Sequence, residues 1–491
     1  MSLSAPQRHV PDGMILALVC AAQFMVVLDV SVVNVALPSI GRELHYTAGG
    51  LQWVVNAYVL TFAGFLLLGG RIADLFGRRR VFIGGLALFS IASLLGGLAQ
   101  TSTELTIARA VQGVGGAVLS PATLTVIMTT FAEGKARHRA LGMWSAVAGA
   151  GGAFGGIIGG VLTNYLSWRW VLFVNVPIGA AAVVAAVALL TETRRREATR
   201  DIDVSGAVLA TVGLATVVYA IVGTTTHPWG SARTIALLAV GIVLLGAFLF
   251  SQARLAKAPL MPLSLFRSRS VSGANAVMLL SGIAFFSMWY FLSLYLQDVL
   301  GYGPLKAGLL FLPMSGAIII GAQTSARLVT RVGVRPVLTT GLLLATGGFV
   351  WLAELGAASG YVSGVLGGSL LTSLGMGLSF TPLATAATAG VPMHQAGLAS
   401  GVLNTSRQVG GSLGLAILAT IATDRTHALL SGAHTGTGAA LTAGYDRAFL
   451  AAAVVMLVAA AVAALAIPAL RRTPEEEVRT AVGTPTPVLT D

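Results

Sequence analysis

Residues 168–200 read WRWVLFVNVPIGAAAVVAAVALLTETRRREATR, and this stretch decides the fold class. Trp168-Arg169-Trp170 suits a membrane interface, and the roughly twenty nearly uncharged residues that follow are enough for one helical crossing. The basic run Arg194–Arg196 then ends the segment on what should be the cytoplasmic side. Because the same pattern recurs along the chain, the sequence predicts an all-α polytopic membrane protein.

Composition supports this class. The chain has 491 residues, of which 55% are hydrophobic and only 10% charged, too little charge for the exterior of a soluble domain. The net charge of +12 could indicate nucleic acid, but the basic residues lie in short segments between apolar runs. We therefore expect a lipid bilayer and no nucleic-acid partner.

Apolar runs of about twenty residues predict fourteen membrane-spanning helices in three groups. The first six lie near 14–38, 51–70, 81–99, 104–130, 140–162 and 169–190. Two more lie near 204–224 and 232–252. The last six lie near 272–298, 305–328, 336–356, 361–383, 398–421 and 446–468.

The predicted organisation is a cytoplasmic N-terminus (1–13), a six-helix bundle (14–190), a cytoplasmic linker (191–203), two additional helices (204–252), a cytoplasmic loop (253–271), a second six-helix bundle (272–468) and a disordered cytoplasmic tail (469–491). Placing both termini in the cytoplasm puts 22 of the 30 basic residues inside and 6 outside. The other 2, Arg109 and Arg407, fall within helices. This bias predicts the orientation.

An internal repeat relates the two bundles. The stretch from Arg71 through Gly77 to Gly85 returns as Arg327 through Gly333 to Gly341, an offset of 256 residues. The same offset brings Gly155 onto Gly411. Parallel repeats of this kind predict two bundles that rock around a central site to give alternating access.

The chain resembles the major facilitator superfamily, specifically its fourteen-helix drug:proton antiporters. Five stretches carry the resemblance, in the expected order: Leu28–Pro38, Gly70–Arg80, Arg109–Gly113, Trp168–Gly179 and Asn404–Gly410. The resemblance implies a proton-coupled exporter of amphipathic drugs or antibiotics in the plasma (inner) membrane. Its partners would be a small-molecule substrate and protons, and we expect it to work as a monomer.

Asp29 is the candidate proton carrier, because a carboxylate deep in a span costs several kcal/mol unless it is protonated, paired or hydrated. Arg109 lies at a comparable depth in the fourth helix, and the resemblance implies that it neighbours Asp29. The alternatives are a packing role for Asp29 and backbone-bonding for Arg109. Gln112 and Gly113, one turn deeper, would add a hydrogen bond and close packing.

Gating is expected at two places. Gly70, Asp74, Gly77 and Arg78 form the predicted loop between the second and third helices, which in the family latches the bundles together. In the fifth helix two glycine ridges, one containing Gly155 and Gly159, allow close helix packing. The family's antiporter motif has proline where this chain has Gly156, so the sequence leaves open whether the glycines supply the hinge.

Arg407 is near mid-membrane in the thirteenth helix, where it would contact substrate or pin helix packing. Phe285 is a further cavity candidate. The predicted substrate-binding residues are Asn34, Trp53, Asn56, Tyr58, Phe286, Trp289, Tyr290, Asn404, Arg407 and Gln408.

Other functions are less well supported. The sequence lacks a Walker motif at its three lysines, and its histidines lack metal-ligand spacing, so we expect neither cofactor nor metal beyond the coupling proton. Gly410-Gly411-Ser412-Leu413-Gly414 matches the hydrolase elbow pattern but lies inside a predicted span, so we expect no enzyme. Export of an endogenous metabolite, peptide or siderophore, and proton-coupled import, stay open.

Overall fold

The computed structural model describes residues 11–131, 135–190, 203–224, 226–257, 259–357, 359–392, 395–431 and 436–468. Within these ranges the regular elements are all helices. The basic run Arg194–Arg196, most of the predicted linker and the predicted tail lie outside the described residues.

The first half of the chain supplies six spans. They are α1 (Asp12–Glu43), α2 (Ala48–Leu51) with α3 (Trp53–Phe76), α4 (Arg78–Leu98), α5 (Ser102–Thr130), α6 (Lys135–Tyr165), and α7 (Trp170–Phe173) with α8 (Asn175–Leu189). Two additional spans follow: α9 (Val204–Gly223) and α10 (Ala232–Phe250), which continues into the π-helix η1 (Ser251–Leu255).

A short 3₁₀-helix, η2 (Leu263–Arg267), precedes the second half. Its spans are α11 (Arg269–Leu294) with η3 (Tyr295–Val299), α12 (Pro304–Leu310) with α13 (Leu312–Val332), α14 (Val334–Leu352), η4 (Tyr361–Leu366) with α15 (Gly367–Thr388), α16 (Ala396–Leu430) and α17 (Thr437–Ala466). Among the described residues, 12 segments are long and apolar enough to cross a membrane. With α6 (31 residues) and α16 (35 residues), which are also long enough, they match the fourteen predicted spans.

The first predicted helix was too short. It does not end at Pro38, because α1 continues through that proline to Glu43. Neighbouring helices can compensate for the backbone hydrogen bond that a proline removes in a membrane helix. Asp29 therefore lies about 21 Å from the Glu43 end of α1, at 1.5 Å per residue, deeper than the sequence boundaries implied.

The predicted loop from Gly70 to Arg80 was also wrong. Helix α3 runs to Phe76 and α4 begins at Arg78, so Gly77 alone joins them. Its φ of 98° is a conformation that glycine adopts at little cost, and Gly333 repeats it with a φ of 89° between α13 and α14. The sequence repeat with an offset of 256 residues therefore includes the glycine that joins two consecutive helices in each half.

The glycine ridges have separate partners. Gly155 and Gly159 face α1, where a side chain at Gly159 would lie 2.8 Å from the Val32 carbonyl oxygen. In the second half, Gly410 and Gly414 face α11 in the same way, against Leu279 and Ile283. The hydrolase-like pattern at 410–414 is therefore part of a helix-packing surface.

The second ridge of α6 meets the other half of the molecule. A Cβ at Gly160 would lie 2.7 Å from the Pro304 carbonyl oxygen and 2.8 Å from Leu305 Cα, and Gly156 packs against Gly308. Small residues let the two backbones approach this closely. These contacts lie at the end of the molecule that carries Glu43 and Pro304, which we call the outer end after the predicted topology.

Helices α1 and α11 complete this closure. Ser293 Oγ donates to the Asn34 carbonyl oxygen (2.6 Å), and Gln297 Nε2 donates to that of Val35 (2.9 Å). Arg42 and Asp298 form an exposed ion pair at 3.4 Å. The structure is therefore closed between its two halves at the outer end.

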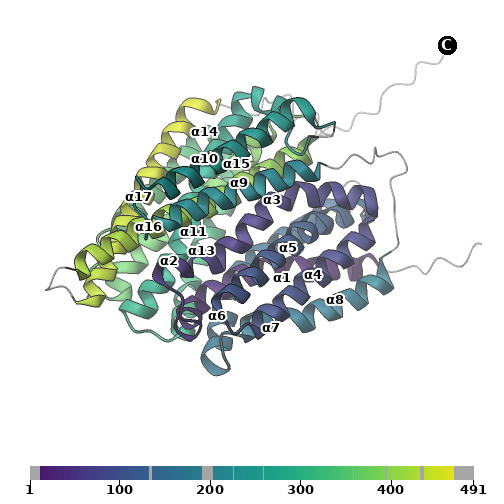
Figure 1. Ribbon diagram of the computed structural model, residues 1–491. Coiled ribbons are helices and arrows are strands. Elements are labelled where there is room, and N and C mark those ends of the chain that lie inside the picture. Colours follow the sequence, from purple (N-terminus) through teal and green to yellow (C-terminus); the bar gives the residue numbers. More distant parts are fainter. Residues whose placement is uncertain are drawn as a thin grey trace, which may run out of the picture.

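In the view of Figure 1, the two additional helices run between α3 of the first half and the helices of the second half. Helix α9 packs on α3 of the first half and α16 of the second, and α10 packs on α9. The Trp53 ring lies 6.2 Å from that of Tyr219 in α9. Helix α9 thus contacts both halves, and α10 packs against them through α9.

Trp168 does not serve as an interface anchor as the sequence suggested. It is 2% exposed, and its Nε1 donates to Glu43 Oε2 at 2.8 Å. Arg169 stacks over the Trp168 ring and pairs with Glu43 at 3.0 Å. The motif instead ties α7 to the end of α1, and the exposed residue of the three is Trp170.

Candidate functional site

Asp29 and Arg109 form an ion pair inside the first half. Arg109 Nη1 lies 2.6 Å from Asp29 Oδ2, and the two side chains are 2% and 0% exposed. Gln112 Nε2 donates to Asp29 Oδ1 at 2.8 Å. The proximity that the resemblance implied is present, and the carboxylate is sealed from water in this conformation.

The guanidinium of Arg109 has several further partners. Its Nε donates to the Val54 carbonyl oxygen (3.1 Å), and its Nη1 donates to Gln112 Oε1 (2.8 Å). It also lies 4.5 Å from the centre of the Tyr58 ring. A buried ion pair is stable when additional hydrogen bonds satisfy its remaining groups, as here. Arg109 therefore has both the acidic partner and the backbone partner that the sequence offered as alternatives.

Asn175 is a member of this site that the sequence analysis missed. Its Nδ2 donates to Asp29 Oδ1 at 2.9 Å and to Ser93 Oγ at 3.0 Å, and the residue is fully buried. The sequence signal that could have identified Asn175 is a carboxamide side chain within the apolar stretch 168–200. Two helices therefore converge on Asp29 of α1: α5 brings Arg109 and Gln112, and α8 brings Asn175.

Replacing Asn175 with leucine should destabilise the protein by about 1–3 kcal/mol, because Asp29 and Ser93 each lose a buried hydrogen-bond partner. Thermal unfolding in detergent would measure the loss. Asn164→Leu, at an exposed position on α6, is the matched control. Equal unfolding temperatures for the two variants would mean that the Asn175 hydrogen bonds contribute nothing to stability.

The predicted gating residues lie around this site and at the inner end of α3. A Cβ at Gly113 would clash with the Tyr58 carbonyl oxygen and Thr61 Oγ1, so glycine is required where α5 crosses α3. Gly70 packs near Pro121 of α5. Asp74 belongs to α3, although its side chain is outside the described residues. Arg78 begins α4. Their gating role stays a prediction.

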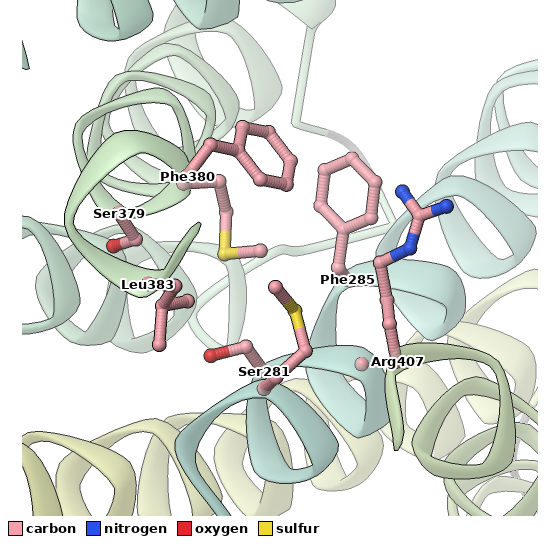
Figure 2. Close-up of a pocket in the computed structure, with 9 residues that line it drawn as sticks. Ser281, Phe285, Ser379, Phe380, Leu383 and Arg407 are labelled. Carbon is pink, nitrogen blue, oxygen red and sulfur yellow. The ribbon is translucent and has the colours of Figure 1, made fainter. Parts of the chain in front are cut away.

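A second candidate site surrounds Arg407 in the other half (Figure 2). The guanidinium extends beside Phe285, in a pocket between α11, α15 and α16. The labelled lining residues are Ser281, Phe285, Ser379, Phe380, Leu383 and Arg407. Arg407 Nη2 donates to Asn404 Oδ1 at 2.8 Å, which brings two of the predicted substrate residues together.

Aromatic candidates extend from this pocket. The Phe285 ring makes edge contacts with Phe380 (6.4 Å between centres) and Trp289 (6.3 Å). Trp289 in turn lies 5.0 Å from Phe311. Phe286 packs on Gly411 of α16.

The remaining substrate candidates are dispersed. Asn34 lies at the closed contact between α1 and α11, and Trp53 packs on α9. Asn56 and Tyr58 are buried in α3. Two more are buried in the second half, Tyr290 in α11 and Gln408 in α16. In this closed conformation, the structure does not gather the ten residues into one pocket.

Comparison with known proteins places this architecture in a family. The family model "Major Facilitator Superfamily" matches residues 19–415. The chain belongs to the major facilitator superfamily, so it is a multi-pass membrane transporter. A solved peptide transporter shares the fold, with a TM-score of 0.67 at 15% identity, covering 94% of this chain and 96% of that one.

Two relatives within this superfamily are named for antibiotic export or resistance. The cephamycin export protein of Amycolatopsis lactamdurans is 45% identical over 93% of each chain. The puromycin resistance protein of Streptomyces alboniger is 41% identical, covering 91% of this chain and 90% of the relative.

Proposed function

We propose that this protein exports amphipathic antibiotics or other drugs from the cytoplasm in exchange for protons. It would do so as a monomer in the plasma membrane, with both termini cytoplasmic. The observation that carries the proposal is the buried Asp29–Arg109 pair in a transporter fold whose similar relatives are named for antibiotic export and resistance.

The proton would act at Asp29. Ionised Asp29 holds donors from α5 and α8 onto α1. Protonation would remove the charge that pairs with Arg109 and convert one acceptor oxygen into a donor, which loosens this junction. Because α1 also carries the backbone carbonyls of the outer closure, a change at Asp29 can reach the contact between the two halves.

One such carboxylate is energetically sufficient. A proton that enters through a potential of about 150 mV supplies about 3.5 kcal/mol. At about 1.4 kcal/mol per tenfold ratio, this supports a gradient of roughly a few hundred-fold for a neutral substrate.

The test is transport by the purified protein in liposomes that enclose a pH-sensitive dye and have an acidic interior. Added puromycin or cefoxitin should accumulate inside while the internal pH rises, and a protonophore should abolish both signals. Protein-free liposomes are the control. Substrate uptake that neither needs the pH gradient nor moves protons would contradict proton antiport.

A further inference from the structure

Arg407 carries a charge that the protein does not neutralise by an ion pair among the described residues. Its polar partner among these residues is the neutral Asn404 side chain. It lies about 17 Å along α16 from Ala396, at 1.5 Å per residue, and is therefore well within the membrane. By contrast, the other intramembrane arginine, Arg109, is paired with Asp29. Within the described part of the second half, Arg407 is thus an intramembrane cation without an ion pair.

Ser281 provides a second unsatisfied group in the same pocket. The residue is 1% exposed, and its Oγ has no hydrogen-bond partner among the described residues. Both Ser281 and Arg407 line the pocket in Figure 2. A buried hydroxyl without a partner costs free energy. In Figure 2 the Ser281 hydroxyl points away from the Arg407 guanidinium, so an acceptor that is absent from the protein itself would meet both groups only once this pocket widens.

The internal repeat shows how the two halves differ beside this arginine. Adding the offset of 256 residues to Asp29 leads to Phe285, which contacts the pocket instead of a carboxylate. Gly282 lies about one turn before Phe285 in α11. It lets the α16 backbone approach α11 at Arg407, since a Cβ at Gly282 would clash with the Arg407 carbonyl oxygen. The second half therefore has an aromatic residue at the position of Asp29, and it has Arg407 at the position of Gly151.

We propose that Arg407 and Ser281 bind the acid group of the exported substrate, so that the preferred cargo is an organic anion, with a carboxylate joined to an apolar or aromatic body. This inference rests on the proposed export function. The guanidinium and hydroxyl would donate to the carboxylate oxygens, and Phe285 and Phe380 would contact the apolar body.

The pocket must widen to accept such a group. Its cavity in this conformation is about 10 Å³, which is about the room needed by one water. The acid group would therefore enter when α11 and α15 separate. Substrate binding on these helices would then occur in the half of the protein opposite to the Asp29 site.

The experiment measures the binding of three probes to the purified protein by calorimetry: cefoxitin, which has one carboxylate, its neutral methyl ester, and the cation puromycin. The native protein should bind cefoxitin about 10-fold or more tightly than the ester, the range of a charge-assisted hydrogen bond. Arg407→Gln and Ser281→Ala should reduce this preference, and Arg407→Lys should restore part of it. Arg425→Gln, an exposed arginine on the same helix, is the matched control.

Equal affinity of the native protein for cefoxitin and its ester would overturn the inference. An Arg407→Gln variant that loses affinity for cefoxitin and for the ester by the same factor would also overturn it. Proton-coupled transport of puromycin alone, with no binding of cefoxitin, would overturn the anion preference while leaving the export function intact. Absence of binding and transport for all three probes would overturn both. Puromycin binding by Arg407→Gln would show that this variant is folded.

Discussion

Asp29→Asn is expected to abolish proton release on substrate binding and concentrative transport, while substrate still binds. The asparagine keeps the size of the side chain but cannot exchange a proton. Removing one member of a buried ion pair costs up to about 3–5 kcal/mol. The loss here should be smaller, because Arg109 keeps Gln112 and the Val54 carbonyl oxygen as partners.

The measurement is the pH change of a weakly buffered, detergent-solubilised sample as puromycin or cefoxitin is added. The native protein should release protons and Asp29→Asn should not. Asp424→Asn, at an exposed carboxylate on α16, tests the same change away from the site. Release that survives in Asp29→Asn would place the coupling proton elsewhere, and ligand binding without release in the native protein would favour another coupling ion.

Gly160→Val is expected to favour the state that is open at the outer end. Valine there would overlap the α12 backbone at Pro304 and Leu305. Overpacking of this kind costs about 1–3 kcal/mol, which corresponds to a shift of about 5–150-fold in the equilibrium between closed and open states. Transport should fall, because the cycle must pass through the closed state.

A reporter cysteine can follow this shift. The single native cysteine, Cys20, is replaced by serine, and Asn34→Cys is introduced at the contact between α1 and α11. Gly160→Val should increase labelling of the reporter by a membrane-impermeant maleimide. Gly152→Val is the matched control, because a Cβ at Gly152 has no neighbour within 4 Å. Unchanged labelling, or an equal increase in both variants, would contradict a gating role for the α6–α12 contact.

Much of the architecture could be predicted because its signals are local. Runs of apolar residues mark the spans, and the offset of 256 residues identifies the two halves. Asp29 and Arg109 stand out as charges in apolar helices, and their proximity followed from the family resemblance. The helix ends were less predictable: Pro38 and Gly70 resemble helix boundaries in sequence, yet α1 and α3 continue past them.

By itself, the sequence determined the class of protein, the approximate spans, the repeat and the two intramembrane arginines, because hydropathy and charge act on each segment separately. Only the tertiary structure decided that Asn175 joins Asp29, that Trp168 is buried against Glu43, and that one glycine ridge of α6 faces α1 while the other faces α12. It likewise decided that Arg109 has an acidic partner whereas Arg407 is left facing a pocket. These outcomes depend on which helix faces meet, and that is set by packing between segments far apart in the chain.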